Sequence, residues 1–271
     1  MRESSYIHGT HPEEQGRLSV LNELLNGAAL RELGLRGGES IVDFGCGLAQ
    51  LTRAMARASH RRVVGIERSE EQLAAALAQA HAAGEQDLVE LRRGDVHEPP
   101  LLDREWGSFD LAHARFVLEH VPDPPRVVSA LVRAVKPGGR IVLQDDDHDV
   151  LRLWPVPAGF DLLWGAYMRS YDRNGNDPFV GRRLVSLLHE AGARPSRCTW
   201  LFFGACAGEE RFAPLVENMA SLLEGAREVM VGGGLLGEAE LDAGLAALRA
   251  WAGRPDAALW FSICWAEGVR R

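Results

Sequence analysis

The chain has 271 residues, of which 46% are hydrophobic and 25% are charged, and its formal net charge is −8. These values are typical of a globular protein, and no basic segment is present that would attract nucleic acid. No run approaches the roughly 18 apolar residues of a transmembrane helix, and the first residues carry no apolar signal-peptide core. We therefore expect a cytoplasmic monomer or homodimer that binds neither nucleic acid nor a membrane.

The four cysteines indicate neither disulfides nor a metal centre. Cys46, Cys198, Cys206 and Cys264 form no C-x-x-C pair, and none lies at metal-ligand spacing from a histidine. We expect buried or unreactive thiols and no bound metal.

A helix is predicted near the N-terminus. The segment Thr10-His-Pro-Glu13 has the residues of a capping box, with proline in the first turn. Apolar residues then recur at helical spacing as far as Ala29, and Gly37-Gly38 ends the segment. Residues 1–37 are therefore expected to form a helical cap.

The most informative segment runs from Ile41 to Thr52, where a buried strand, a glycine turn and a helix follow one another. Gly45 and Gly47 allow a tight turn and a close approach of the backbone to a ligand. The helix from about 48 to 58 would present its first N–H groups at the same point. Asp43 adds a carboxylate, which repels phosphate and suits an ammonium group. The segment predicts a site for a small polar cofactor.

Downstream of this turn, strands and helices alternate. Glu67, Asp95, His113 and Asp145 each fall at or just after a strand end. The alternation predicts an α/β fold with an open, mostly parallel sheet and helices on both faces. Ligands bind such sheets at the carboxyl ends of the strands. The expected elements are strands at about 62–67, 88–92, 109–113 and 140–144, and helices at about 69–83 and 125–136.

The rest of the chain is less regular. We expect helices at about 158–171 and 181–191 and strands at about 196–205 and 257–267, with a helical insertion at 207–256. We expect one domain with a core at 38–150, further sheet and helices at 151–206 and 257–271, and the insertion as a candidate substrate lid. Large apolar side chains in this half indicate core packing or, as the alternative, that lid. They are Trp154, Phe160, Trp164, Tyr167, Tyr171, Phe212, Met219 and Leu223.

The glycine turn also has to be compared with a dinucleotide site. The fingerprint G-x-G-x-x-G would place its third glycine at position 50, where this chain has Gln50. That departure and the acid at Asp43 disfavour a nucleotide-dependent oxidoreductase, which we keep as an alternative.

Together these residues resemble the class I S-adenosylmethionine-dependent methyltransferases. The resemblance covers roughly Glu39 to Asp145, and more weakly a leader at Tyr6–Thr10 that is similar to a subgroup of bacterial small-molecule methyltransferases. It implies a Rossmann-like sheet of seven strands, with S-adenosylmethionine as cofactor and S-adenosylhomocysteine as product. The matching segments are Val42–Gly47, Glu67, Gly94-Asp95-Val96, Phe109–Val121 and Leu131–Arg140.

The resemblance assigns cofactor roles position by position. Gly45 and Gly47 would wrap the methionine part, and Asp43 would lie near its ammonium group, directly or through water. Glu67 would accept hydrogen bonds from both ribose hydroxyls, because a carboxylate has two oxygens for a vicinal diol. Asp95 would accept from the adenine amino group. The remaining expected contacts come from Tyr6, His8, Arg17, Cys46, Gln50, Arg68, Gln72, Gly94, Val96, Ala114 and Arg115.

Catalytic residues are harder to place. Methyl transfer from a sulfonium needs an aligned acceptor and the exclusion of water, and it needs a base only if the acceptor must lose a proton. His148 could act as a base, oriented by Asp145 or Asp146. The same acids could instead bind a cationic amine or form a solvated loop. His120 is expected to be a packed histidine on an apolar helix.

The sequence therefore predicts an enzyme that methylates a small molecule at oxygen, nitrogen or carbon. The acceptor is expected to be aromatic or amine-bearing, in specialised metabolism, and Arg115 could anchor an acceptor carboxylate. The alternatives are the oxidoreductase, a non-catalytic S-adenosylmethionine-binding module and a methyltransferase that acts on a protein.

Overall fold

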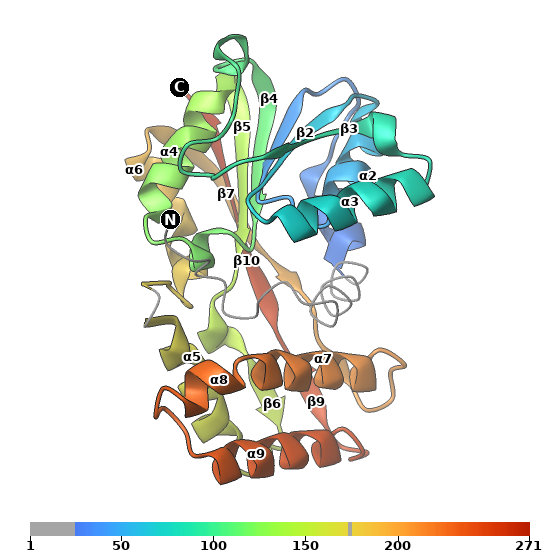
Figure 1. Cartoon of the computed structure of the whole chain (residues 1–271), viewed down its shortest axis with the longest axis vertical. Coiled ribbons are helices and arrows are strands. Elements are labelled where there is room, and N and C mark those ends of the chain that lie inside the picture. The colour runs from blue at the N-terminus through green and yellow to red at the C-terminus, as the bar shows by residue number, and fades with distance from the viewer. Residues whose placement is uncertain (1–24, 173–174) are drawn as a thin grey trace.

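The computed structural model of the protein describes residues 25–172 and 175–271 (Figure 1). Residues 25–33 are helical, as expected for the end of the N-terminal helix. The expected start of that helix, and the cofactor contacts of Tyr6, His8 and Arg17, lie outside the described residues. No described helix combines the length and the hydropathy that crossing a lipid bilayer would require.

One sheet of seven strands forms the centre of the molecule, in the order β3-β2-β1-β4-β5-β10-β7 (Figure 1). The first five strands in this order are parallel, whereas β10 runs antiparallel to both β5 and β7. The predicted mostly parallel α/β sheet is confirmed, and its order reverses between β1 and β4, where ligands are expected to bind. The strands are β1 (Ile41–Phe44), β2 (Val63–Glu67), β3 (Val89–Arg93), β4 (Phe109–Arg115), β5 (Val135–Asp145), β7 (Ala193–Phe202) and β10 (Ser262–Arg270).

Side-chain alternation along the strands divides the core between the two faces of this sheet. In β1, Ile41 packs in the core that includes α2, whereas Val42 and Phe44 pack in the core that includes α4 and α6. Asp43 therefore points towards α2. The helices that cover the sheet are α2 (Gln50–Ser59), α3 (Glu70–Ala82), α4 (Pro124–Ala134) and α6 (Leu184–Glu190).

Local sequence signals set where two of these helices start. Ser69 accepts a hydrogen bond from the amide of Gln72 (3.2 Å) at the start of α3, as the capping pattern predicts. The helix α4 begins only at Pro124, because residues that precede prolines avoid the helical conformation. His120, which was expected on an apolar helix, lies instead in a short 3-10 turn, Leu118–His120, that precedes α4.

The sequence does not predict a second sheet of three short strands. Its order is β6-β9-β8, and each strand lies next in sequence to a strand of the large sheet: β6 follows β5, β8 follows β7, and β9 precedes β10. Since β5, β10 and β7 are neighbours, the small sheet continues this edge of the large sheet beyond a bend. The strands are β6 (Arg152–Trp154), β8 (Ala205–Cys206) and β9 (Ala258–Trp260).

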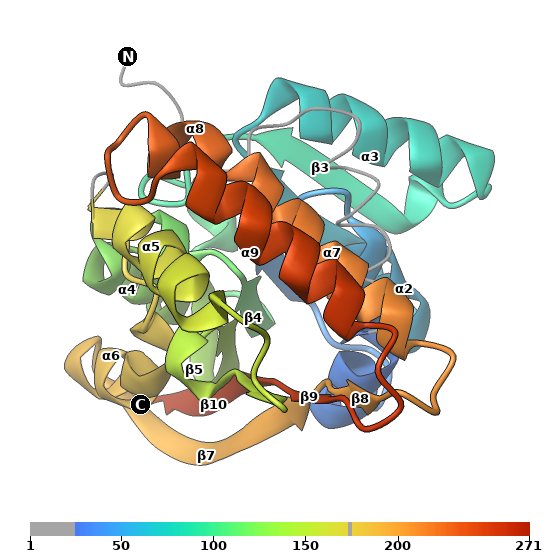
Figure 2. The ribbon, with the colours of Figure 1, turned by 90° about the horizontal axis from the view of Figure 1, so that it is seen from below.

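Four helices pack on the small sheet and share a hydrophobic core with it, separate from the two cores of the large sheet. Figure 2 shows α7 and α9 side by side beneath the large sheet. The segment 207–256, which was expected to be a helical insertion, contains α7, α8 and α9. The helices are α5 (Phe160–Asp172), α7 (Phe212–Gly225), α8 (Arg227–Val231) and α9 (Glu238–Trp251).

Candidate functional site

Two glycines shape the turn between β1 and α2. The φ of Gly45 is +71° and that of Gly47 is +52°, which residues with a side chain rarely adopt. A Cβ atom at Gly45 would lie 2.4 Å from Cγ2 of Val117. The amides of Gly45 and Cys46 donate to the carbonyl of Ile66 in β2 (2.8 and 3.0 Å). The neighbouring strand therefore holds the turn in shape.

The helix α2 begins immediately after the turn. Its N-cap residue, Ala49, has a φ of +54°, and no side chain caps the helix. Uncapped amides at a helix start carry partial positive charge and can donate to a ligand. The turn and the helix start therefore offer several backbone donors at one point.

Glu67 ends β2 and faces the same turn. Its carboxylate accepts hydrogen bonds from the amides of Gly47 (3.0 Å) and Ser69 (2.8 Å). Burial raises the pKa of this carboxyl group, although the backbone donors act in the opposite direction. Each carboxylate oxygen accepts one of these bonds and keeps a lone pair, so the geometry leaves room for the predicted hydroxyl contacts.

Asp43 belongs to a row of polar side chains that crosses β1, β4 and β5 beneath α2. Its Oδ1 lies 2.7 Å from Nδ1 of His113, and its Oδ2 accepts a hydrogen bond from the hydroxyl of Thr52 (2.6 Å). The other ring nitrogen of His113 lies 2.7 Å from Nε2 of Gln144. The row joins three strands and a helix at the carboxyl ends of the strands.

This row bears on the expectation that Asp43 lies near the ammonium group of the cofactor, directly or through water, which stays a prediction. The side chain is only 3% exposed, and both oxygens are engaged within the protein. Asp43 therefore positions β4 and α2 relative to β1.

The end of β4 connects the turn to the N-terminal helix. Arg115, which follows Ala114, donates to Oδ1 of Asn26 (2.8 Å). Burial lowers the pKa of Arg115 to about 10, and the charge of Asp43 partly opposes this effect. The next residue, Phe116, has a φ of +55°, a strained conformation for a bulky side chain.

Asp95 follows β3 and lies beside His97. Its Oδ1 accepts a hydrogen bond from the amide of His97 (2.9 Å) and lies 2.7 Å from the ring Nδ1. Burial would raise the pKa of Asp95, but the contacts with His97 outweigh burial and lower it. Gly94 is required by packing, because a Cβ atom there would lie 2.4 Å from Cδ of Pro100.

Other predicted cofactor residues surround the turn. The side chain of Gln50 donates to that of Gln79 (3.3 Å), Gln72 is buried, and Arg68 is exposed. Burial and two nearby carboxylates raise the pKa of Cys46 well above its ordinary value. A thiol with a raised pKa is a poor nucleophile, which favours the interpretation of Cys46 as a turn residue.

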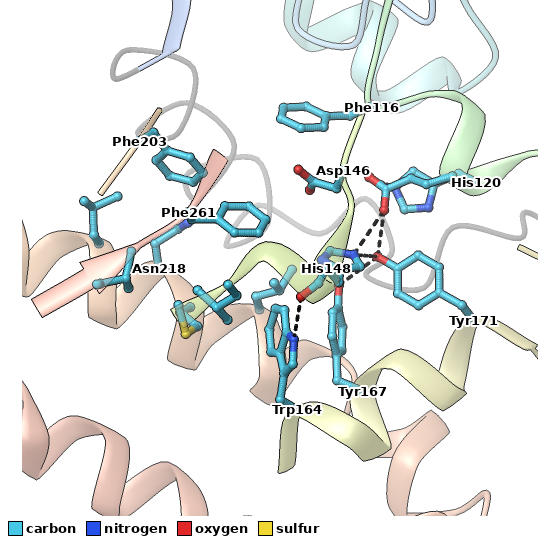
Figure 3. Close-up of a pocket in the computed structure, with 16 residues that line it drawn as sticks. Phe116, His120, Asp146, His148, Trp164, Tyr167, Tyr171, Phe203, Asn218 and Phe261 are labelled. Atoms are coloured by element: carbon cyan, nitrogen blue, oxygen red, sulfur yellow. Dashed lines mark hydrogen bonds and ion pairs between the residues drawn. The ribbon is translucent and has the colours of Figure 1, made fainter. Parts of the chain in front are cut away.

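A cavity lies where the large sheet bends into the small one (Figure 3). Three segments at the bend contribute to its wall: His148 after β5, Phe203 after β7, and Phe261 between β9 and β10. The rings of Phe203 and Phe261 contact each other, with centroids 5.3 Å apart. The aromatic lining consists of Phe116, Trp164, Tyr167, Tyr171, Phe203 and Phe261.

Three ionisable side chains, Glu119, Asp146 and His148, form what we call the polar corner of this cavity (Figure 3). Nε2 of His148 lies 3.3 Å from Oε2 of Glu119 and 3.2 Å from the hydroxyl of Tyr171. The same hydroxyl donates to Oε2 of Glu119 (3.0 Å). Glu119 and His148 are each only 3% exposed. The corner is a compact, nearly dry cluster.

The charges in the polar corner depend on one another. Burial would raise the pKa of Glu119, but His120, His148 and Tyr171 outweigh it and hold that pKa at about 2. Burial would lower the pKa of His148, but its contact with Glu119 and the nearby aspartates raise it. Burial and the charge of Glu119 raise the pKa of Asp146 well above its ordinary value.

Asp145 lies outside the polar corner, so the predicted orientation of His148 by Asp145 is wrong. Its carboxylate accepts hydrogen bonds from the amides of Val117 (3.2 Å), Leu118 (2.8 Å) and Asp146 (3.2 Å). Asp145 thereby fixes the chain that follows β4. The carboxylate that holds the ring of His148 belongs to Glu119.

The acids after β5 also do not form a solvated loop, which was the alternative. Asp145 and Asp147 are buried, and Asp147 pairs with Arg182 at 2.6 Å. Only Asp149 is exposed among these acids. Fold contacts, rather than solvent, fix this segment.

Some of the large apolar residues in the second half of the chain line the cavity, and others only pack in the hydrophobic core of the small sheet and its helices. One of them, Trp154, is 66% exposed and belongs to neither. The residues that line the cavity are Trp164, Tyr167, Tyr171 and Met219. Those that pack in the core of the insertion without lining the cavity are Phe160, Phe212 and Leu223.

No role is predicted from the sequence for Glu119, Asn218, Phe203 or Phe261. Glu119 has one usable signal, because it is an acid in the otherwise apolar run Phe116–Val121. The others carry no local signal, since each lines the cavity only through contacts between distant segments.

Comparison with known proteins bears on this site. A family model described as a methyltransferase domain matches residues 42–143. The 27-O-demethylrifamycin SV methyltransferase of Amycolatopsis mediterranei (strain S699) is 34% identical over 154 residues, which are 57% of this chain and 54% of that protein. The chain spans about half the length of the curated relatives it matches.

Solved structures share the fold over most of the chain. Geranyl diphosphate C-methyltransferase from Streptomyces coelicolor A3(2), in complex with Mg²⁺, geranyl diphosphate and S-adenosyl-L-homocysteine, has a TM-score of 0.58 at 17% identity, covering 94% of this chain and 80% of that one. The [4+2]-cyclase SpnF has a TM-score of 0.57 at 21% identity, covering 89% and 79%. At these identities the likeness shows the fold alone. The chain therefore carries a methyltransferase domain over residues 42–143, within a fold that solved methyltransferase structures share.

Proposed function

We propose that the protein transfers the methyl group of S-adenosylmethionine to an oxygen atom of a small, largely apolar molecule in the aromatic cavity. The observation that carries the proposal is the position of Phe116. The residue before it, Arg115, ends β4 at the predicted methionine end of the cofactor site, and Phe116 itself lines the cavity. Direct transfer needs the donor and the acceptor side by side, and this adjacency supports it.

The chain's own groups fit the cofactor. The glycines of the Gly45–Gly47 turn let the backbone approach a ligand, the uncapped start of α2 offers donors, and Glu67 and Asp95 offer acceptors for hydroxyl and amino groups. We assign the predicted cofactor contacts to these residues. When bound, S-adenosylmethionine supplies an already activated methyl group.

The cavity favours an apolar, ring-bearing acceptor with a hydroxyl group. Aromatic side chains can stack on a ring and contribute about 0.5–1.5 kcal/mol per pair beyond burial. The polar corner is the place for the reacting hydroxyl, because buried polar groups need partners. A relative that is named for O-methylation supports oxygen as the acceptor atom.

Removal of the acceptor proton is assigned to the polar corner. His148 is the proposed proton acceptor, held by Glu119 at 3.3 Å in place of the expected Asp145. A positioned base typically contributes a factor of about 10²–10⁴ in rate. Residues 207–256 supply α7 to the cavity wall, and we propose that this insertion covers the acceptor and excludes water.

The test has a binding stage and a transfer stage. Calorimetry with S-adenosylmethionine is expected to show one site per chain. Labelled cofactor is then offered to phenols and hydroxylated polycycles, with their methyl ethers as matched controls that lack the acceptor proton. His148→Ala is expected to lower kcat about 100-fold, while the exposed His189→Ala on α6 has no effect.

Other outcomes identify the alternatives. Cofactor binding without transfer to any acceptor would indicate a non-catalytic binding module. Binding of NAD(H) without binding of S-adenosylmethionine would indicate the oxidoreductase. Transfer to amines in place of hydroxyls would support methyl transfer as the activity, but it would show that the acceptor atom is nitrogen and not oxygen.

A further inference from the structure

The polar corner has the geometry of a metal-binding site. Glu119, Asp146 and His148 each offer one ligand atom, and these three atoms all lie within 4.8 Å of one another. Two ligand atoms that share an ion at about 2.0–2.4 Å each can be at most about 4.8 Å apart. The three residues come from the turn after β4 and from the segment after β5, which the parallel pairing of β4 and β5 brings together.

The polar corner also has polar atoms without partners. Oδ1 of Asp146 and Nδ1 of His148 are sealed from solvent and have no hydrogen-bond partner among the described residues. The side chain of His148 is 97% buried, since 3% of its surface remains exposed. A buried donor or acceptor without a partner costs about 1–3 kcal/mol. This second observation indicates that the corner is completed by a ligand.

The balance of charge points to a positive ligand. Two carboxyl groups, those of Glu119 and Asp146, line this end of the cavity, and a third, that of Asp145, lies outside the wall but interacts electrostatically with both. Among the described residues, Glu119 forms ion pairs with His148 (3.3 Å) and His120 (3.5 Å), and no lysine or arginine pairs with any of the three. Several buried carboxylates without a permanent cation are characteristic of sites that hold a metal ion.

We propose that Glu119, Asp146 and His148 bind one divalent cation, whose open positions face the aromatic cavity. Two carboxylates with one imidazole suit Mn²⁺ or Zn²⁺ better than Ca²⁺, which prefers an all-oxygen set. The ion would bind the acceptor oxygen and lower the pKa of its hydroxyl group, so that the hydroxyl gives up its proton to water before the methyl group is transferred. The inference rests on the proposed acceptor cavity and changes the role of His148 from proton acceptor to ligand.

The experiment measures metal binding without cofactor or acceptor, so its outcome is separate from that of methyl transfer. The full chain is stripped with EDTA and titrated with MnCl₂ and with ZnCl₂ by calorimetry, and bound Mn²⁺ is followed by electron paramagnetic resonance. One ion per chain is expected. Asp146→Asn and Glu119→Gln are each expected to weaken binding more than tenfold. Asp149→Asn, an exposed acid of the same segment, is the matched control and is expected to bind as the wild type does.

Three results would overturn the proposal. One is no binding of either ion at millimolar concentration, and another is binding that neither variant weakens. The third is Asp146-dependent binding of phenethylammonium chloride without metal binding, which would make the corner a site for a substrate ammonium group. Circular dichroism checks the fold of each variant. If Glu119→Gln fails to fold, the resonance signal of Mn²⁺ bound to the wild type is the deciding measurement.

Discussion

The two ends of the proposed reaction site are built differently. At the cofactor end, Asp43 and Glu67 have both carboxylate oxygens engaged by groups of the protein itself. At the acceptor end, Oδ1 of Asp146, Nδ1 of His148 and Oδ1 of Asn218 have no partner among the described residues. The two carboxylates at the cofactor end are thus held in place before a ligand arrives, although Oε1 of Gln144 and Nε2 of His97 nearby also lack a partner among the described residues. At the acceptor end, the atoms without partners belong to the side chains that are proposed to contact the ligand. Substitutions at the cofactor end should therefore lower the stability of the protein, whereas substitutions at the acceptor end should lower its activity and leave its stability unchanged.

The largest effect is expected from Gly45→Ala. The new Cβ would clash with Val117, and alanine would have to adopt a φ of +71°. We therefore expect the free energy of unfolding to fall by about 2–4 kcal/mol. Affinity for S-adenosylmethionine should fall at least about 30-fold by calorimetry. Gly138→Ala is the matched control, because its φ is +79° and no atom lies within 4 Å of its added Cβ.

The double variant Gly45→Ala, Val117→Ala separates the clash from the backbone strain. Removing the Val117 side chain should restore part of the lost affinity. No recovery would mean that the turn conformation alone, and not the packing against Val117, governs binding.

The next largest effect is expected from Asp43→Ala. The change leaves the His113 ring and the Thr52 hydroxyl buried without their partner, so the free energy of unfolding should fall by about 2–4 kcal/mol. Chemical denaturation measures the effect, and the exposed Asp103→Ala is the control. Unchanged stability together with lost cofactor binding would show that Asp43 contacts the ligand directly and does not mainly hold the protein together.

Asn218→Leu is expected to have a smaller effect on the free energy of unfolding, and one of opposite sign. The change removes an unpartnered amide from an apolar wall, so the free energy of unfolding should stay constant or rise by about 0.5–1 kcal/mol. The KM for the acceptor should rise if Asn218 recognises a second polar group on it. Ser221→Leu on the exposed side of α7 controls for the effect of leucine on the helix. Clear destabilisation would show that Asn218 already has a structural role.

The smallest effect is a pH dependence of cofactor affinity. Burial raises the pKa of Glu67, so on acidification this carboxylate takes up a proton at a higher pH than an ordinary glutamate. A protonated carboxyl group accepts hydrogen bonds poorly, and affinity should therefore fall, by up to about tenfold, as the pH falls towards that raised pKa. Calorimetry between pH 8 and 5 measures the change. Glu67→Gln should bind more weakly and independently of pH in this range.

The sequence predicts the two ends to different extents, for a physical reason. The strand, turn and helix around Gly45 are local and show in the spacing of apolar residues and glycines. Glu119 and Phe261 meet in one cavity although they are more than a hundred residues apart, and no local pattern records that contact. The strands β6, β8 and β9 are only two or three residues long, too short for an alternation pattern. The expectation of a helix at His120 was wrong because its apolar neighbours suggest a helix where the chain forms only a short 3-10 turn.

The bend between the two sheets restricts how the insertion can move. The chain crosses it in three neighbouring strand segments, after β5, after β7 and before β10, and returns a fourth time between α5 and α6. The amide of Phe203 donates to the carbonyl of Phe261 (2.8 Å) across two of the strand crossings. The three strand crossings favour a flexing about the line that joins them, because twisting or sliding would strain all three strands at once, and the link between α5 and α6 limits how far that flexing can go. The residues on that line also line the cavity. Opening the cavity for an acceptor and reshaping its wall would then be a single mechanical event, with the phenylalanine pair as its axis.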